Sequence, residues 1–358
     1  MLGSQLPKNE QFSQKDYLQK LYEGNTENFI VIAHVLVEPF LTGWHQFSMD
    51  GWTVIPTSGG RQYFKEFRMT STPDDWLNAI TSLNKILLSY FICEGVPRII
   101  YGFELPKHLP PEKFLQLPLI FGNSIHDFSI EEHATKSSEL SAFIFNGMVS
   151  NDPYYQAEIS QIEDWYELFN NEVVFNCVNL VRESFVIINK QFNTFAYFNF
   201  VNICTGIVLL VSALEGLFTH NQENTADIKF KFTTIGSIYY EKNVTEEFLG
   251  KYDSGQRNKK IAHLQFKNLL SELYNLRSTI AHGNYSKITK IKEWKKILTL
   301  LNVQYDEKLN QAVLSKHIAL ALGLLQKHIL ALIVQSKADL HKGVDILDEI
   351  ICNTEKTQ

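Results

Sequence analysis

The sequence predicts an α+β domain followed by an all-helical domain. Between residues 28 and 69, short runs of β-branched and aromatic residues alternate with Gly and Ser turn signals, which is typical of antiparallel strands. From about residue 150, apolar residues recur at spacings of three and four, which indicates amphipathic helices. A chain of 358 residues can build two sizeable cores. We therefore expect an α+β domain over residues 27–150 and a helical domain over residues 151–340, with polar tails at residues 1–26 and 341–358.

The N-terminal domain is expected to combine strands with one long helix. Pro73, followed by two aspartates, is a helix-start signal, and the apolar spacing after it extends this helix to about Cys93. Prolines scattered between residues 104 and 135 predict mostly loop there. The histidines of this domain show no metal-ligand spacing, so we assign them no site. The expected strands are residues 28–39, 44–49, 52–56, 62–69 and 97–103.

The helical domain is predicted from periodicity, with a polar connection at residues 219–260 that holds shorter pieces such as residues 228–240. Residues 192–214 form a run of 23 residues without a charge, which is long enough to span a bilayer. Since asparagines interrupt this run and Glu215 follows it directly, we interpret it as a buried core helix. The expected helices are residues 154–169, 173–190, 192–218, 262–282, 288–301 and 308–337.

Charge and cysteine usage narrow the classes of function. The net charge of −6 argues against a general nucleic-acid binder, but residues 251–296 carry eleven Lys or Arg against three acidic residues. Such a stretch suits a phosphate backbone, and it equally suits a solvated helix face. The four cysteines are far apart and lack metal-ligand spacing. Together with the polar N-terminus, they favour a reducing, cytoplasmic setting without a membrane span.

One predicted helix end carries candidate chemistry. Phe266 and the apolar residues that repeat after it share one face of the helix over residues 262–282, and Gly283 follows that helix. Glycine there can adopt the left-handed conformation that closes a helix, which places His282 in the last turn. The helix dipole favours a protonated imidazole at that position. Arg277 lies five residues earlier, about 140° around an ideal helix, yet its long side chain can reach an anion shared with His282.

The residues around this helix end resemble the motif of the HEPN superfamily, and most closely its Apea-like branch. The matching segments are LYNLRSTIAHG at residues 273–283, with Arg, four residues, His and Gly in order, and ALEGLF at residues 213–218. The resemblance covers about residues 192–296. By this match Glu215 is the acidic partner of Arg277 and His282. A carboxylate in so apolar a helix is costly unless it is paired, so Glu215 calls for a cation.

The resemblance implies a HEPN-type helical bundle that cleaves RNA without a metal ion or cofactor. In that chemistry the ribose 2′-hydroxyl attacks the adjacent phosphate. His282 moves protons, Arg277 holds the phosphate, and Glu215 orients both. The active cleft of the superfamily combines motif residues from two protomers, so we expect a homodimer. Further contacts to RNA are expected from Ser278, Asn275, Lys287 and Lys290.

The Apea-like branch also resembles toxin-like effectors of prokaryotic anti-phage defence. By that analogy residues 27–150 act as a sensor or regulator that answers to a phage-derived trigger or a neutralising partner. A different class of function is a catalytically inactive module that binds RNA, a nucleotide or a protein partner. This alternative remains because Ser278 follows Arg277, whereas many active members of the superfamily carry Asn, Asp or His at that position. A third alternative is a scaffold in which Arg277 and His282 are only helix-end structure and Glu215 forms a structural ion pair with Arg277.

Overall fold

The chain folds into two compact units, and the boundary between them falls within helix α2 (Pro73–Glu94). One unit comprises residues 1–86 and 98–143, and the other comprises residues 87–97 and 144–358. The boundary expected near residue 150, the two expected tails and almost all of the loop region expected at residues 104–135 lie outside the described residues. The computed structural model describes residues 28–36, 47–57, 60–95, 97–104, 159–193, 200–218, 225–250, 259–288, 290–304 and 311–336.

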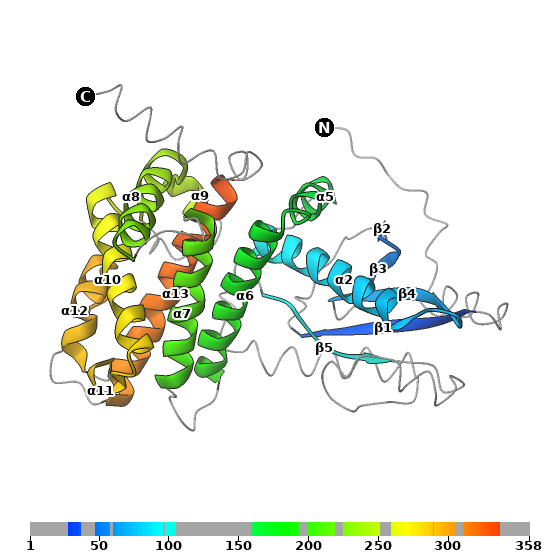
Figure 1. Ribbon diagram of the computed structural model, residues 1–358, viewed down its shortest axis with the longest axis horizontal. Coiled ribbons are helices and arrows are strands. Elements are labelled where there is room, and N and C mark those ends of the chain that lie inside the picture. The colour runs from blue at the N-terminus through cyan, green and yellow to red at the C-terminus, as the bar shows by residue number, and fades with distance from the viewer. Residues whose placement is uncertain are drawn as a thin grey trace. The chain divides into compact units, whose positions relative to one another are not determined.

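Among the described residues of the N-terminal unit, five strands form one sheet in the order β2-β3-β4-β1-β5 (Figure 1). Every neighbouring pair is antiparallel, as the alternation of apolar runs with turn signals predicted. The strands are β1 Asn28–Leu36, β2 Phe47–Met49, β3 Trp52–Thr57, β4 Gly60–Arg68 and β5 Ile99–Glu104.

Helix α2 begins at the predicted proline and packs on this sheet through aromatic side chains. The ring of Trp76 stacks on that of Phe67 of β4, with centroids 4.2 Å apart. The indole N–H of Trp52 in β3 donates to the carbonyl of Ala79 at 2.9 Å. A buried indole needs such a partner. These contacts tie the first half of the helix to the middle of the sheet.

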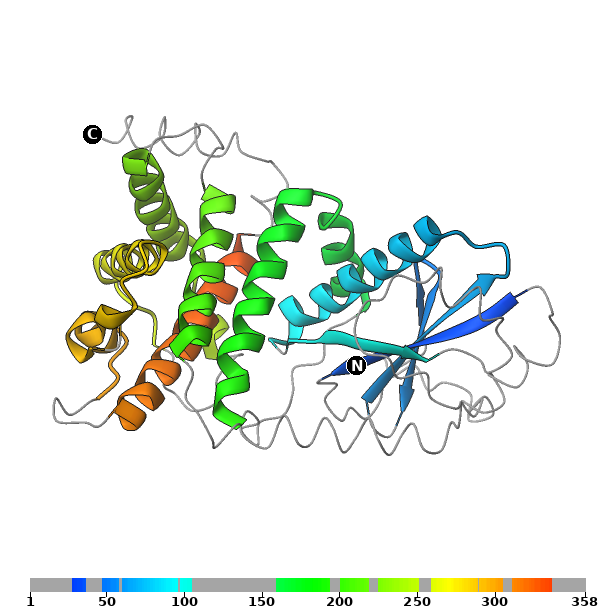
Figure 2. The same cartoon turned by 60° about the horizontal axis from the view of Figure 1, so that its bottom comes forward.

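The described remainder of the chain is helical, so the predicted order of an antiparallel sheet followed by helices is confirmed at this level. In the C-terminal unit, α6 and α7 lie side by side, and α10 contacts α7, α8 and α12 (Figures 1 and 2). The helices are α5 Ile159–Leu168, α6 Glu172–Asn193, α7 Phe200–Phe218, α8 Thr225–Asn243, α9 Glu246–Gly250, α10 His263–Ala281, α11 Tyr285–Ile288, α12 Ile291–Leu300 and α13 Gln311–Gln335.

The structure differs from two of the predictions for this unit. The helix expected over residues 192–218 is divided, because α6 continues to Asn193 and α7 begins at Phe200. Because the run at residues 192–214 is uncharged throughout, its composition gives no sign of where one helix ends and the next begins. The piece expected at residues 228–240 within a polar connection is part of a longer helix of 19 residues, α8. Its buried side chains, such as Phe232 and Ile235, do share a face, but a glycine and threonines between them weaken the helical pattern in the sequence.

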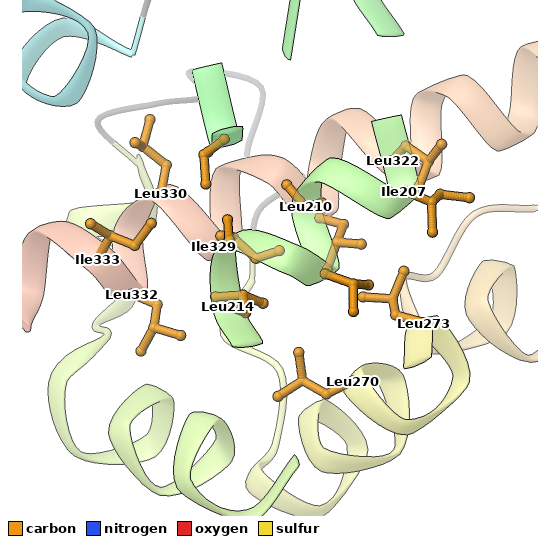
Figure 3. Close-up of a cluster of buried hydrophobic side chains, with 14 of the residues drawn as sticks. Ile207, Leu210, Leu214, Leu270, Leu273, Leu322, Ile329, Leu330, Leu332 and Ile333 are labelled. Atoms are coloured by element: carbon orange, nitrogen blue, oxygen red, sulfur yellow. The ribbon is translucent and has the colours of Figure 1, made fainter. Parts of the chain in front are cut away.

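Helix α7 lies in the core of the C-terminal unit, as expected for the uncharged run. Figure 3 shows Leu210 and Leu214 of α7 close to Leu270 of α10 and Ile329 of α13, and all four side chains are fully buried. Within the described residues, Val201–Phe218 is long and apolar enough to cross a membrane by length and composition, a test that core helices also pass. Its packing against α6, α8, α10 and α13 accounts for its apolar composition.

A glycine and a buried hydroxyl hold α6, α7 and α13 together. A Cβ added at Gly206 of α7 would lie 2.6 Å from the side chain of Ile188 in α6, so only glycine allows this approach. The hydroxyl of Ser184 donates to the carbonyl of Gly206 at 2.9 Å. The amide nitrogen of Gln326 in α13 donates in turn to Ser184 Oγ at 3.1 Å. This buried chain of hydrogen bonds fixes the relative positions of the three helices.

Candidate functional site

Helix α10 ends in a Schellman motif, which fixes the position of His282. His282 is the capping residue, and Gly283 follows in the left-handed region with φ 69°. The N–H of Gly283 donates to the carbonyl of Ile280 at 2.9 Å, and the N–H of Asn284 donates to that of Thr279 at 3.1 Å. The left-handed glycine predicted from the sequence is therefore confirmed. Because both sides of His282 are hydrogen-bonded to the last turn, its exposed side chain is held at the helix end.

The predicted pairing of Glu215 with Arg277 is present. Arg277 Nη2 in α10 donates to Glu215 Oε2 in α7 at 3.4 Å. The Glu215 side chain is 16% exposed and the Arg277 side chain is 34% exposed, so the pair lies at the edge of the helical core. A guanidinium group has five N–H donors in a planar fork. Arg277 can therefore hold Glu215 and bind a second anion at the same time.

The surroundings of this ion pair are poorly solvated on the side of α7. Burial raises the pKa of the Glu215 carboxyl above its usual value, and the nearby Arg277 guanidinium opposes that shift. Burial likewise raises the pKa of the Tyr274 hydroxyl; Glu215 adds to this shift and Arg277 opposes it. Charge interactions are stronger in such surroundings than in open water. An anion that approaches Arg277 would gain more there than at an exposed side chain.

A second cation, Lys229 of α8, lies beside the same residues. Its ammonium nitrogen donates to Asn275 Oδ1 at 2.8 Å. The nitrogen is 5.9 Å from the centroid of the Tyr274 ring, and the Arg277 guanidinium carbon is 6.0 Å from that centroid. Sequence reasoning missed Lys229, because its partner is 46 residues away along the chain and α8 was expected to be part of a connection. No local signal in the sequence marks it, because the residues on either side of Lys229 do not distinguish it from a solvated lysine.

The remaining candidates on α10 are separate from the ion pair. Within the described residues, the His282 side chain makes no hydrogen bond or ion pair with Arg277 or Glu215. Ser278 is half-buried, and its carbonyl accepts the N–H of His282 at 3.1 Å. Asn275 is exposed, and its side chain is engaged by Lys229. A single chain thus joins Glu215 to Arg277 and leaves His282 five residues further along the helix.

Lys287 and Lys290 follow the end of α10 and are exposed. Lys287 lies in α11 and Lys290 directly precedes α12, and both short helices pack against α10. Neither lysine has a carboxylate partner among the described residues. Further along α12, Lys296 pairs with Glu272 at 2.8 Å, which neutralises part of the basic stretch. The end of α10 therefore borders a surface with positive charge.

A buried pair of polar side chains, Tyr240 and His328, lies next to the residues that precede α10. Tyr240 of α8 and His328 Nδ1 of α13 are 2.8 Å apart, and the N–H of Ile261 donates to the Tyr240 oxygen at 3.2 Å. A neutral His328 can form this contact in either ring tautomer, with the phenol as the donor or as the acceptor of a second hydrogen bond. Burial, with Lys327 nearby, lowers the pKa of His328 to about 4. The Tyr240 ring also stacks on Phe266 with centroids 3.7 Å apart. The sequence gives no sign of this pair, because the two residues are 88 positions apart.

The described part of the chain contains no group of three or more His, Cys, Asp or Glu side chains that could hold a metal ion. Comparison with protein-family models, curated proteins and solved structures yields no match for this chain. The resemblance to the HEPN superfamily therefore depends on the quoted segments, residues 213–218 and 273–283, and on the contact that their helices make.

Proposed function

We propose that the protein is a metal-independent endoribonuclease of the HEPN type. The observation that supports this proposal is the ion pair between Glu215 and Arg277. It connects the two sequence segments that carry the resemblance, although they are 62 residues apart. If the pattern of Arg, four residues and His had arisen by chance, there would be no reason to expect Arg277 to contact an acidic residue of an earlier core helix.

The side chains suit cleavage by an internal nucleophile. The ribose 2′-oxygen attacks the neighbouring phosphorus, the bond from phosphorus to the 5′-oxygen breaks, and no water is consumed. His282 takes the proton from the 2′-hydroxyl or supplies one to the leaving 5′-oxygen. Arg277 stabilises the charge that develops on the phosphoryl oxygens, and Glu215 keeps the guanidinium in place. The products are a 2′,3′-cyclic phosphate and a 5′-hydroxyl.

The proposal includes a homodimer. It follows from the resemblance, because the active cleft of the superfamily combines motif residues from two protomers. We further propose a cytoplasmic, toxin-like effector of prokaryotic anti-phage defence, in which the N-terminal unit answers to a phage-derived trigger or a neutralising partner. Ser278, Asn275, Lys287 and Lys290 are proposed to contact the RNA.

The test is cleavage of mixed cellular RNA by the purified protein in excess EDTA. His282→Ala and Arg277→Ala are the test variants, and Gln265→Ala, an exposed position at the other end of α10, is the matched control. The proposal expects cyclic-phosphate ends from the wild-type and control proteins and none from the two test variants. Cleavage that requires a metal ion, or that persists in His282→Ala, would contradict it.

The alternative is a catalytically inactive module that binds RNA, a nucleotide or a protein through the same residues. It is favoured by the absence of contact between His282 and the ion pair in one chain and by Ser278 after Arg277. RNA retention without cleavage by the wild-type protein would establish this alternative in place of the nuclease.

A further inference from the structure

We infer that Lys229 is a second anion-binding residue of the site, and that Asn275 positions its ammonium group for the phosphate backbone of RNA. This inference rests on the function proposed above. It adds a residue from α8, which lies outside both segments that carry the HEPN resemblance. It also changes the role of Asn275 from a direct RNA contact to a support for Lys229.

Charge pairing leaves Lys229 available for an anion. Arg277 is paired with Glu215, whereas the contacts of Lys229 are to neutral groups, the Asn275 amide oxygen and the Tyr274 ring. No carboxylate partner of Lys229 occurs within the described residues. An ammonium group has three N–H donors, and Asn275 accepts from one of them. As far as the described residues show, two of its donors are left for a ligand.

The position of Lys229 is defined more closely than that of an ordinary surface lysine. It is half-buried, and its hydrogen bond crosses from α8 to α10. These two helices pack closely, since a Cβ at Gly236 of α8 would lie 2.9 Å from the Leu270 side chain. A lysine side chain otherwise loses considerable rotamer entropy when it binds a ligand. Anchoring by Asn275 removes part of that cost before RNA arrives.

Lys229 and Arg277 lie in the same region of the surface, because both are about 6 Å from the centre of the Tyr274 ring and are therefore no further apart than the sum of these two distances. An RNA strand carries a negative charge at every nucleotide, so two nearby cations can act on the same or neighbouring phosphates. Arg277 offers a planar fork to the reacting phosphate, while Lys229 acts as a point charge. We therefore expect Lys229 to contribute to binding of the strand rather than to proton transfer.

The experiment measures binding of a short, fully 2′-O-methylated oligoribonucleotide, which cannot be cleaved by 2′-hydroxyl attack, over a range of salt concentrations in EDTA. The variants are Lys229→Gln, Lys229→Arg and, as matched control, Lys242→Gln at an exposed lysine near the end of α8. Loss of one phosphate contact lowers the slope of log affinity against log salt by about 0.7. We expect this change, with weaker binding by a factor of about 3 to 10, in Lys229→Gln but not in Lys229→Arg or Lys242→Gln.

Asn275→Ala should weaken binding as well, and the double variant Lys229→Gln/Asn275→Ala should bind no worse than Lys229→Gln alone. Thermal unfolding of the same proteins separates this coupling from a loss of fold. Additive effects of the two substitutions would show that Asn275 does not act through Lys229.

Cleavage of the unmodified RNA in parallel separates this inference from the proposed function. If the wild-type protein cleaves RNA but Lys229→Gln keeps the wild-type affinity and salt slope, the inference is wrong and the nuclease stands. If binding depends on Lys229 but no cleavage occurs, the inference stands for an inactive module. If the wild-type protein neither binds nor cleaves RNA, both are wrong.

Discussion

At the scale of single residues, the one charged side chain at the end of an apolar run, Glu215, predicted a cationic partner. Its position directly after an uncharged run required a cation nearby, and the structure supplies Arg277. The choice of Arg277 needed the family resemblance, since other cations were available in the sequence. Lys229 could not be found in the same way, because nothing local distinguishes a lysine that is held by an amide on another helix from a solvated one.

We predict that Glu215→Gln changes stability little but abolishes cleavage. The folded state raises the pKa of Glu215 through burial, so the ionised carboxylate is less favoured in the folded protein than in the unfolded chain at neutral pH. Glutamine removes that cost together with the ion pair, and the two changes should cancel to within about 1 kcal/mol. Arg277→Gln should destabilise the fold more, because it leaves the carboxylate without its cation.

Urea unfolding at neutral pH, with cleavage assayed on the same samples, checks both variants. A loss well above 2 kcal/mol in Glu215→Gln would favour the scaffold interpretation, in which the pair mainly joins α7 to α10. As the pH falls below the ordinary range of a glutamate carboxyl, both the folded and unfolded forms become protonated. The cost of the buried carboxylate should then disappear.

His328 predicts a loss of stability in acid. Its pKa is lowered from 6.5 to about 4 in the folded protein, so the unfolded chain binds more protons between those values. Stability is therefore fully present above pH 6.5 and falls as the pH decreases towards 4, by roughly 3 kcal/mol from this residue. Unfolding measured at a series of pH values should show a shallower slope in His328→Gln. Equal slopes in both proteins would contradict the prediction.

At the scale of elements, close helix packing depends on small residues at particular positions. We predict that Gly206→Ala destabilises the protein by about 1 to 3 kcal/mol, because its Cβ would overlap the buried Ile188 side chain between α6 and α7. Gly323 of α13 is the matched control, since nothing lies within 4 Å of a Cβ there. Gly323→Ala should stabilise by up to about 1 kcal/mol through helix propensity. Denaturant unfolding of both variants gives the comparison, and equal effects would rule out the close approach.

The helix ends offer a second comparison. Gly283 and Asn302 both adopt positive φ, at 69° and 53°, and both follow helices that end in the same hydrogen-bond pattern. Gly283→Ala should cost about 1 kcal/mol from backbone strain alone, since a Cβ there meets no atom within 4 Å. Asn302→Gly should change stability by less than about 0.5 kcal/mol.

Thermal unfolding measures these effects, and cleavage by Gly283→Ala tests whether the placement of His282 depends on this helix end. Wild-type stability in Gly283→Ala would show that the end of α10 can relax without cost.

At the scale of the whole molecule, the sequence predicted what depends on local patterns. The antiparallel strands, the start of α2 at Pro73 and the left-handed Gly283 are each encoded within a few residues. The sheet order and the three-helix arrangement around Gly206 depend on contacts between distant segments, which periodicity does not reveal. The same limit applies to the site. The pairing of Arg277 on α10 with Glu215 could be predicted, whereas the contact between Lys229 on α8 and Asn275 could not.

The most direct test of the proposed nuclease uses an oligoribonucleotide that contains a mapped cleavage site, incubated in EDTA with the wild-type protein. A matched substrate carries a single 2′-deoxy nucleotide on the 5′ side of the scissile phosphate. We expect a cyclic-phosphate product from the first substrate, no cleavage of the second at that bond, and no product from either with His282→Ala. Cleavage of the 2′-deoxy substrate at the same bond, or a product with a 5′-phosphate, would contradict attack by the 2′-hydroxyl.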